Sequence, residues 1–192
     1  MKTFSLIILL ILPLTHYSQD KLYELIYAES EDLSPAQLSG CQLDTIVYEN
    51  MFDCFPCAAY TPLQHAVVKK NHRLVKLLLN MGADPNFGFD TPLHFAANNN
   101  DLESAQILIE NGAELDKISS LNMTPLLVAA KWSSPDVLQF LIDQGANWKA
   151  KDEFGDNALQ ISDKCCGDGM GGMILPENRE RTRKILMELG LE

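Results

Sequence analysis

The feature that most constrains the fold of this 192-residue chain is an internal repeat. The triplet Thr-Pro-Leu begins at Thr61, Thr91 and Thr124. A Gly-Ala pair follows each triplet, and its glycine, which is Gly82, Gly112 or Gly145, stands 21 positions after the threonine. A fixed spacing in three copies indicates one structural unit repeated along the chain. The sequence therefore predicts a stack of similar units.

Each copy is expected to hold two short helices. Threonine followed by proline is typical of a helix start, because Thr caps the first turn and Pro is tolerated at the first helical position. Polar stretches such as Asn98–Asn100 separate this helix from a second, apolar one. The second helix is expected to end at the glycine, in a left-handed conformation. Neither helix could bury its apolar face alone, so the copies must stack.

The repeated unit resembles the ankyrin repeat. Its second copy, residues 91–116, reads TPLHFAANNNDLESAQILIENGAELD, and the family pattern begins T-P-L-H-x-A-A and ends with a helix, G-A and a hairpin loop. The resemblance covers residues 61–156 closely. It implies an all-α solenoid of stacked helix-turn-helix units with hairpin fingers, in about four to five repeats including degenerate ends.

The copies depart from the family pattern at two positions. The histidine of T-P-L-H occurs only as His94, and Gln64 and Leu127 replace it in the neighbouring copies. The resemblance implies that His94 is structural and bonds the backbone of the adjacent repeat. The glycine usually found between the two helices is Lys70, Asn100 or Ser133 here, of which asparagine best tolerates a left-handed turn.

The first 18 residues have the pattern of a secretory signal peptide. Lys2 precedes an apolar run from Phe4 to Leu12, which is too short for a membrane-spanning helix of roughly 20 residues. We expect cleavage after Ser18, no membrane insertion after cleavage, and a secreted or periplasmic protein. Residues 19–57 are expected to form a degenerate N-terminal capping repeat with an extended finger that contains cysteines, and residues 58–192 the ankyrin repeats.

The last repeat is interrupted. Asn157-Ala158-Leu159 replaces Thr-Pro-Leu, and the closing helix, expected from Arg181 to Leu189, ends at Gly190. This leaves an insertion at about residues 165–178. It contains a G-x-G-x-x-G pattern, Gly167 to Gly172, but no strand precedes it as a dinucleotide-binding loop requires. We interpret the insertion as a loop that caps the end of the stack or adds a contact.

Three cysteines in the N-terminal part leave two alternatives open. Cys41, Cys54 and Cys57 are disulfide candidates, since a bridge would staple the long finger. Cys54 and Cys57 also have the spacing of a redox-active pair, and Cys41, Cys54, Cys57 and His65 could together bind zinc. A thiol redox or zinc-binding protein is therefore the alternative function, although we expect no cofactor and no metal.

Charge and motifs favour a binding protein over an enzyme. The formal net charge is −11, which opposes binding to nucleic acid and favours a basic protein partner. The chain has no G-x-S-x-G, H-E-x-x-H or P-loop motif, so no catalytic residue is assigned. We expect a monomer. One specific hypothesis is an inhibitor or immunity protein that blocks a basic toxin or hydrolase.

The resemblance implies that fingers and inner-helix positions contact the partner. Mapped on this chain, such positions hold aromatic residues, which often carry binding energy, and acidic residues, which suit a basic partner. The predicted protein-binding residues are Phe87, Phe89, Phe95, Trp132, Trp148, Asp90, Asp116 and Asp152.

Overall fold

The computed structural model describes residues 43–44, 47–48, 59–164 and 175–190, and the chain divides into two compact units, Met1–Pro62 and Leu63–Glu192. In the first unit, strand β1 (Val47–Tyr48) pairs antiparallel with strand β2 (Ala59–Tyr60), with Val47 opposite Tyr60. This strand pair was not predicted from the sequence, because two residues are too few to show the period of a strand. The signal-peptide prediction and the three cysteine predictions lie outside the described residues.

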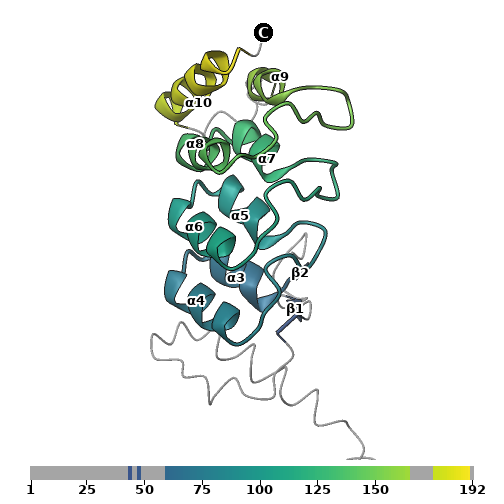
Figure 1. Ribbon diagram of the computed structural model, residues 1–192, viewed down its shortest axis with the longest axis vertical. Helices are drawn as coiled ribbons and strands as arrows, with labels where there is room; N and C mark the ends of the chain where they lie inside the picture. The colour runs from purple at the N-terminus through teal and green to yellow at the C-terminus, as the bar shows by residue number, and fades with distance from the viewer. Residues whose placement is uncertain (1–42, 45–46, 49–58, 165–174, 191–192) are drawn as a thin grey trace, which may run out of the picture. The chain divides into compact units, whose positions relative to one another are not determined.

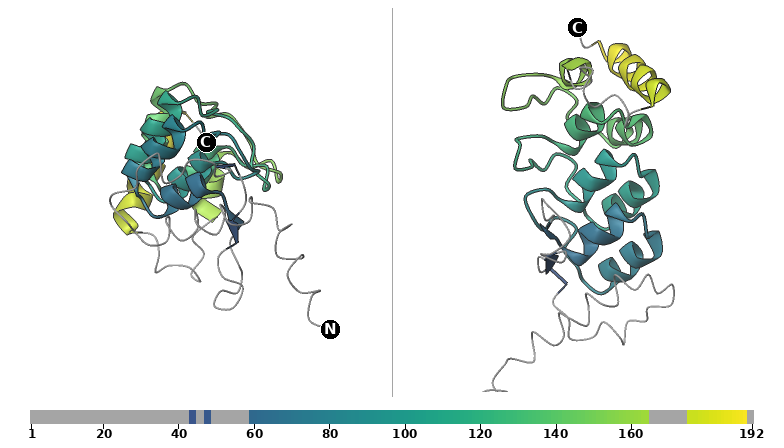
Figure 2. Two further views of the ribbon diagram at one scale, coloured as in Figure 1. Left: turned by 90° about the horizontal axis from the view of Figure 1, so that it is seen from below. Right: turned by 180° about the vertical axis from the view of Figure 1, so that it is seen from behind.

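The second unit is a stack of helix pairs, and the predicted all-α ankyrin solenoid is confirmed (Figure 1). The inner helix of each pair is seven residues long: α3 (Pro62–Val68, which begins at the unit boundary), α5 (Pro92–Asn98), α7 (Pro125–Lys131) and α9 (Ala158–Lys164). The outer helices are α4 (His72–Asn80), α6 (Leu102–Glu110), α8 (Pro135–Asp143) and α10 (Pro176–Glu188). Three loops, called here the first (84–90), second (114–123) and third (147–156) finger, project on one side (Figure 2).

The starts of the inner helices follow from their caps. Thr124 Oγ1 accepts a hydrogen bond from the Leu127 amide, and Thr91 forms a capping box with His94. The helix α9 begins without Thr-Pro, yet Asn157 and Gln160 form the same reciprocal pair of bonds at 2.9 Å each. A capping box satisfies amides that lack a partner in the first turn. Asn157-Ala158-Leu159 is thus the equivalent of Thr-Pro-Leu that the repeat predicts.

The Gly-Ala pairs end the outer helices. Gly82, Gly112 and Gly145 have φ values of 93°, 89° and 90°, and the amide of the following alanine donates to a carbonyl five residues back, as Ala113 does to Leu108 at 2.9 Å. This is the Schellman arrangement, which favours glycine because other residues are strained at positive φ. The repeated Gly-Ala pair therefore has a backbone cause.

The turns between inner and outer helices also use the left-handed conformation. Lys70, Asn100 and Ser133 have φ values of 54°, 48° and 53°, at the positions where the family usually has glycine. Asn100 also uses its side chain, because Oδ1 accepts from the amides of Asp136 and Val137 and Nδ2 donates to the Asp136 carboxylate. Asn100 therefore joins the second repeat to the start of α8.

A carboxylate at this junction links a further helix. Arg181 of α10 donates to Asp136 Oδ1 at 2.8 Å. Burial would raise the pKa of Asp136, but the hydrogen bonds from Arg181 and Asn100 outweigh it and hold that pKa below its usual value. The contact thus favours the ionised carboxylate and ties α10 to α8.

The core runs along the stack between inner and outer helices. Its largest fully buried side chains are leucines of both layers, among them Leu93, Leu126, Leu138 and Leu186. Alanine pairs such as Ala96-Ala97 and Ala129-Ala130 are buried on the inner helices, where small side chains let neighbouring helices approach closely. Truncating a core leucine to alanine is expected to cost roughly 2–5 kcal/mol.

The boundary of the last insertion needs a correction. Helix α10 begins at Pro176, not Arg181, and has 13 residues where the other outer helices have 9. Residues 176–178, assigned to the insertion from the sequence, are the first turn of this helix. Proline at the first position and Glu177 in the first turn favour a helix start at this point, whereas the repeat spacing alone indicates a later start. Part of the insertion is therefore additional helix.

Candidate functional site

Each finger exposes a large apolar side chain to solvent. Phe89 of the first finger is 82% exposed, Leu121 of the second 54% and Phe154 of the third 80%. Single exposed apolar residues are common on protein surfaces, but several on one side of a stack are unusual. Phe89 was among the predicted binding residues, whereas Leu121 was not. This row of three residues is called here the fingertip row.

The second and third fingers end in the same turn, although their sequences differ. In the second finger the Ser119 amide donates to Met123 O, and Ser119 Oγ accepts from the amides of Leu121 and Met123. In the third finger the Asp152 amide donates to Asp156 O, and Asp152 Oδ1 accepts from the amides of Phe154 and Asp156, both at 2.9 Å.

The two turns therefore place Leu121 and Phe154 at equivalent positions. The residues that follow them, Asn122 and Gly155, have positive φ values of 54° and 83°. A sequence signal for Leu121 existed, because residues 114–123 and 147–156 are equally long and align Leu121 with Phe154.

The third residue of an inner helix tethers the next finger in two cases. Gln64 Nε2 donates to Asp90 O at 2.7 Å, and His94 Nε2 donates to Met123 O at 3.0 Å. The predicted structural role of His94 is confirmed. Its Nδ1 accepts from the Thr91 amide, which requires a neutral ring, and burial lowers the pKa of His94. Leu127, at the same position of α7, has no donor for the third finger.

A pocket lies where this tether is missing. It has a volume of about 390 Å³, in the lower range for pockets that hold small ligands. Its apolar lining comes from the two fingertips and from residues below them, and consists of Leu121, Met123, Phe154 and Ile161. Its charged lining consists of Lys131, Lys164, Asp152, Glu153 and Asp156. Asp152 of this lining was among the predicted protein-binding residues.

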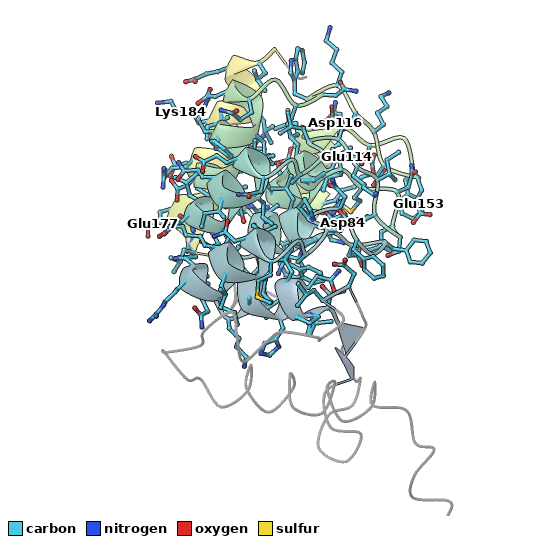
Figure 3. All side chains as sticks on the ribbon, turned by 60° about the horizontal axis from the view of Figure 1, so that its bottom comes forward. Asp84, Glu114, Asp116, Glu153, Glu177 and Lys184 are labelled. Atoms are coloured by element: carbon cyan, nitrogen blue, oxygen red, sulfur yellow. The ribbon has the colours of Figure 1, made fainter. Side chains whose placement is uncertain are left out.

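Charge is divided across this face. Asp84, Glu114, Asp116 and Glu153 lie on the finger side of the stack, as Figure 3 shows, whereas Glu177 and Lys184 lie on α10. The inner helices, in contrast, carry Lys131 and Lys164 near their carboxyl ends. The four labelled acidic residues of the finger side therefore belong to the fingers, and the inner helices add basic groups beside them.

The three predicted acidic residues bond within the chain. Asp116 Oδ1 accepts from the Asn147 amide at 2.9 Å and joins the bases of the second and third fingers. Asp152 forms the turn described above, and Asp90 accepts from Ser120 Oγ at 3.3 Å. Each carboxylate therefore has a structural partner, and its contact with another protein stays a prediction.

The predicted aromatic residues differ in exposure. Phe89 is open to solvent, whereas four others are partly covered: Phe87, Phe95, Trp132 and Trp148. Lys149 lies 4.9 Å from the ring centre of Trp148, within the range of a cation–π contact. Gln64 also donates to Phe87 O at 3.3 Å, so the backbone of Phe87 is held against α3. Their role in binding stays a prediction.

The geometry of the stack agrees with a match to known proteins. A family model described as ankyrin repeats, in three copies, matches residues 63–152. The chain therefore contains ankyrin repeats of this family over residues 63–152. The match begins in α3 and ends in the third finger, so α9, α10 and the insertion lie beyond it.

Three curated relatives each match about half of the chain or less. Ankyrin repeat and SOCS box protein 11 of Homo sapiens is 36% identical over 104 residues, which is 51% of this chain and 31% of that protein. Putative ankyrin repeat protein FPV014 of Fowlpox virus is 31% identical over 98 residues, 49% of this chain and 22% of that protein. Transient receptor potential cation channel subfamily A member 1 of Homo sapiens is 36% identical over 73 residues, 38% of this chain and 6% of that protein.

The chain spans about a third or less of the length of these relatives, whose names differ in kind. The region that the family model matches is the repeat stack, which is a protein–protein interaction module and not a catalytic fold. A shared fold does not carry over the function of a whole protein. Among the described residues, no three His, Cys, Asp or Glu side chains gather as metal ligands, and no helix has the length and hydropathy of a membrane span.

Proposed function

We propose that the chain is an exported, non-catalytic ankyrin-repeat protein that binds a basic partner protein through its fingers and inner helices. The observation that carries this proposal is the fingertip row, because Phe89, Leu121 and Phe154 expose large apolar surface, and Leu121 and Phe154 also line a pocket. Apolar surface of this kind marks interaction sites, and aromatic residues dominate binding energy where a partner covers them.

The charge of the fingers supports a basic partner. Asp84, Glu114, Asp116 and Glu153 give the finger side a negative potential, and the whole chain has a formal net charge of −11. Opposite charges steer two proteins together and discriminate against partners of the same sign. Inhibition of, or immunity against, a basic toxin or hydrolase is the specific form of this proposal, since a rigid stack can cover a partner's surface.

Affinity capture tests the binding face. The full chain is immobilised, and bound proteins are compared with those held by a Phe89→Ala/Phe154→Ala double variant. Met187→Ala is the matched control, because Met187 is also an exposed apolar residue but lies on α10. We expect the wild-type chain and the control to capture basic proteins that the double variant does not hold. Salt should release these proteins, because it screens surface charges. Retention of every captured protein by the double variant would contradict the proposal.

Export is tested separately. The apolar run Phe4–Leu12 behind Lys2 supports a signal peptide. The chain, expressed with a C-terminal tag, is recovered from medium and cell fractions, and its mass gives the N-terminus. We expect a product that begins after Ser18 outside the cytoplasm. An intact N-terminus in the cytoplasmic fraction would rule out this part of the proposal.

A further inference from the structure

The pocket between the last two fingers has features that define what it can bind. Its floor is apolar and already buried, with Met123 and Ile161 only 5% and 6% exposed. Its rim is apolar and open to solvent, formed by Leu121 and Phe154 from equivalent turns of the two fingers. A large apolar side chain that enters between them would extend the core of the repeat outward and cover both rim residues.

The charges around the pocket are not equivalent. Lys164 pairs with Asp156, so these two groups neutralise each other. Asp152 already accepts two amide hydrogen bonds within its turn. Glu153 stands beside Phe154, is exposed, and makes no ion pair with another described residue. A cation brought to the finger side of the pocket would therefore meet Glu153 without competing with an existing bond.

The third finger also differs in how it is held. Gln64 donates to the carbonyl oxygen of Asp90, the last residue of the first finger. His94 donates to the carbonyl oxygen of Met123, the last residue of the second finger. Leu127 has no donor, so in the described part of the chain Asp156 O accepts only from Asp152, within the same turn. At its base the finger remains fixed through Asn147 and Asp116. The turn from Asp152 to Asp156, which forms the outer wall of the pocket, can thus shift as one body while the base of the third finger stays in place.

We propose that this pocket takes one large apolar side chain from an exposed segment of the partner, and that a lysine or arginine next to that residue pairs with Glu153. This inference rests on the proposed protein-binding function and specifies its partner by chemistry. Lys131, on the inner wall, supplies an N–H donor for a backbone carbonyl of the same segment. The partner's recognition element is therefore a short apolar–basic motif.

A peptide library tests this without knowledge of the partner. A phage-displayed library of random 12-residue peptides is panned on the full chain, and enriched peptides are measured by fluorescence anisotropy. We expect enriched sequences that share a large apolar residue with Lys or Arg within three positions. Leu121→Ala and Phe154→Ala should each weaken binding by about tenfold, because they remove the rim of the pocket. Met187→Ala, the exposed control on α10, should leave it unchanged.

A double-mutant cycle tests the charge pair. Glu153→Gln is combined with replacement of the peptide's basic residue by glutamine, and the four affinities are compared. We expect the two single changes each to weaken binding severalfold and the second change to add almost nothing after the first. Additive losses would show that the basic residue does not meet Glu153 and would overturn the charge assignment.

Other outcomes separate this inference from the proposed function. If enriched peptides lose binding with Phe95→Ala or Trp132→Ala but not with Leu121→Ala or Phe154→Ala, the pocket is not the recognition site, while protein binding by the inner helices stands. If no peptide is enriched, a short motif does not bind here and the inference fails, whereas affinity capture still decides the proposed function. Variants that lose the unfolding transition of the wild type are replaced by Leu121→Ser and Phe154→Ser.

Discussion

His94 Nε2 donates a hydrogen bond to the carbonyl oxygen of Met123 across 3.0 Å, from the inner helix of one repeat to the end of the next finger. The same ring accepts from Thr91 through Nδ1, at 3.0 Å from its amide nitrogen and 2.8 Å from its hydroxyl. The His94 side chain thus caps the start of α5 and positions the end of the second finger. Gln64 and Leu127 occupy the same position in the neighbouring repeats, so the chain itself supplies the substitutions that test this role.

His94→Gln should be tolerated and His94→Leu should not. Glutamine has both an acceptor for the Thr91 amide and a donor for Met123 O, as Gln64 and Gln160 illustrate in their own helices. Leucine leaves buried polar groups without partners, which costs about 1–3 kcal/mol. Urea unfolding should show a loss below about 1 kcal/mol for the first variant and a larger loss for the second. Equal losses would show that packing of the ring, not its hydrogen bonds, matters.

Stability should depend on pH through His94. Burial lowers the pKa of His94 in the folded chain below the 6.5 of an unperturbed histidine. As the pH falls, His94 is therefore protonated in the unfolded chain before it is protonated in the folded chain. Its contribution to the free energy of unfolding is fully present above about pH 6.5 and is lost as the pH drops from there toward the folded pKa. The slope from one proton is at most about 1.4 kcal/mol per pH unit.

The difference between wild type and His94→Gln isolates this contribution from other titrating groups. Melting temperatures of both proteins are measured from pH 7.5 to 5. We expect the wild type to lose more stability than the variant over this range. Parallel curves would indicate that His94 is not protonated on unfolding in this window.

The third finger should become more rigid with Leu127→His. The second and third fingers are equally long, so a histidine at this position can reach Asp156 O as His94 reaches Met123 O. One added hydrogen bond should slow hydrogen exchange of the Phe154, Gly155 and Asp156 amides by about fivefold. His94→Leu should speed exchange at Leu121, Asn122 and Met123, as the reciprocal control. A third finger whose exchange is already as slow as that of the second would contradict the missing-tether interpretation.

The sequence predicted the stack because its determinants are local. Thr-Pro caps, Gly-Ala ends and left-handed turn positions act through the backbone within a few residues, and each recurs at a fixed spacing. His94 was predicted from its place in the family motif, and its bond to Met123 confirms that role. The start of α10 was missed because the spacing analysis counted back from Gly190 and ignored Pro176.

The candidate site was less predictable, because it depends on loop conformation. Whether Asp116 and Asp152 face a partner or bond to backbone amides cannot be read from residue type, and both bond within the chain. Leu121 resembles an ordinary loop residue until the turn around Ser119 is known to match the turn around Asp152. The pocket depends on side chains from two fingers and two helices, so no local pattern could indicate it.

Two residues with positive φ should respond oppositely to glycine. Lys70, with φ of 54°, is exposed, and its Nζ donates only a surface bond to Asn99 O. Lys70→Gly relieves a left-handed strain of roughly 1 kcal/mol and should stabilise the chain. Asn100→Gly relieves less strain, because asparagine tolerates positive φ better than lysine, and it removes three hydrogen bonds to the start of α8, so it should destabilise the chain. Urea unfolding of both variants gives the sign, and a gain from Asn100→Gly would mean that its side-chain bonds contribute little.

The turn that shapes the fingertip row can be tested by exchanging its two versions. Ser119 Oγ accepts from two amides in the second finger, and Asp152 Oδ1 does so in the third. Ser119→Asp should therefore preserve the turn, whereas Ser119→Ala leaves the Leu121 and Met123 amides without this acceptor and should destabilise it by about 1 kcal/mol. Amide chemical shifts of residues 119–123 distinguish the outcomes. If alanine leaves these shifts unchanged, the backbone hydrogen bond from the Ser119 amide to Met123 O is enough to hold the turn. The position of Leu121 would then not depend on the Ser119 hydroxyl.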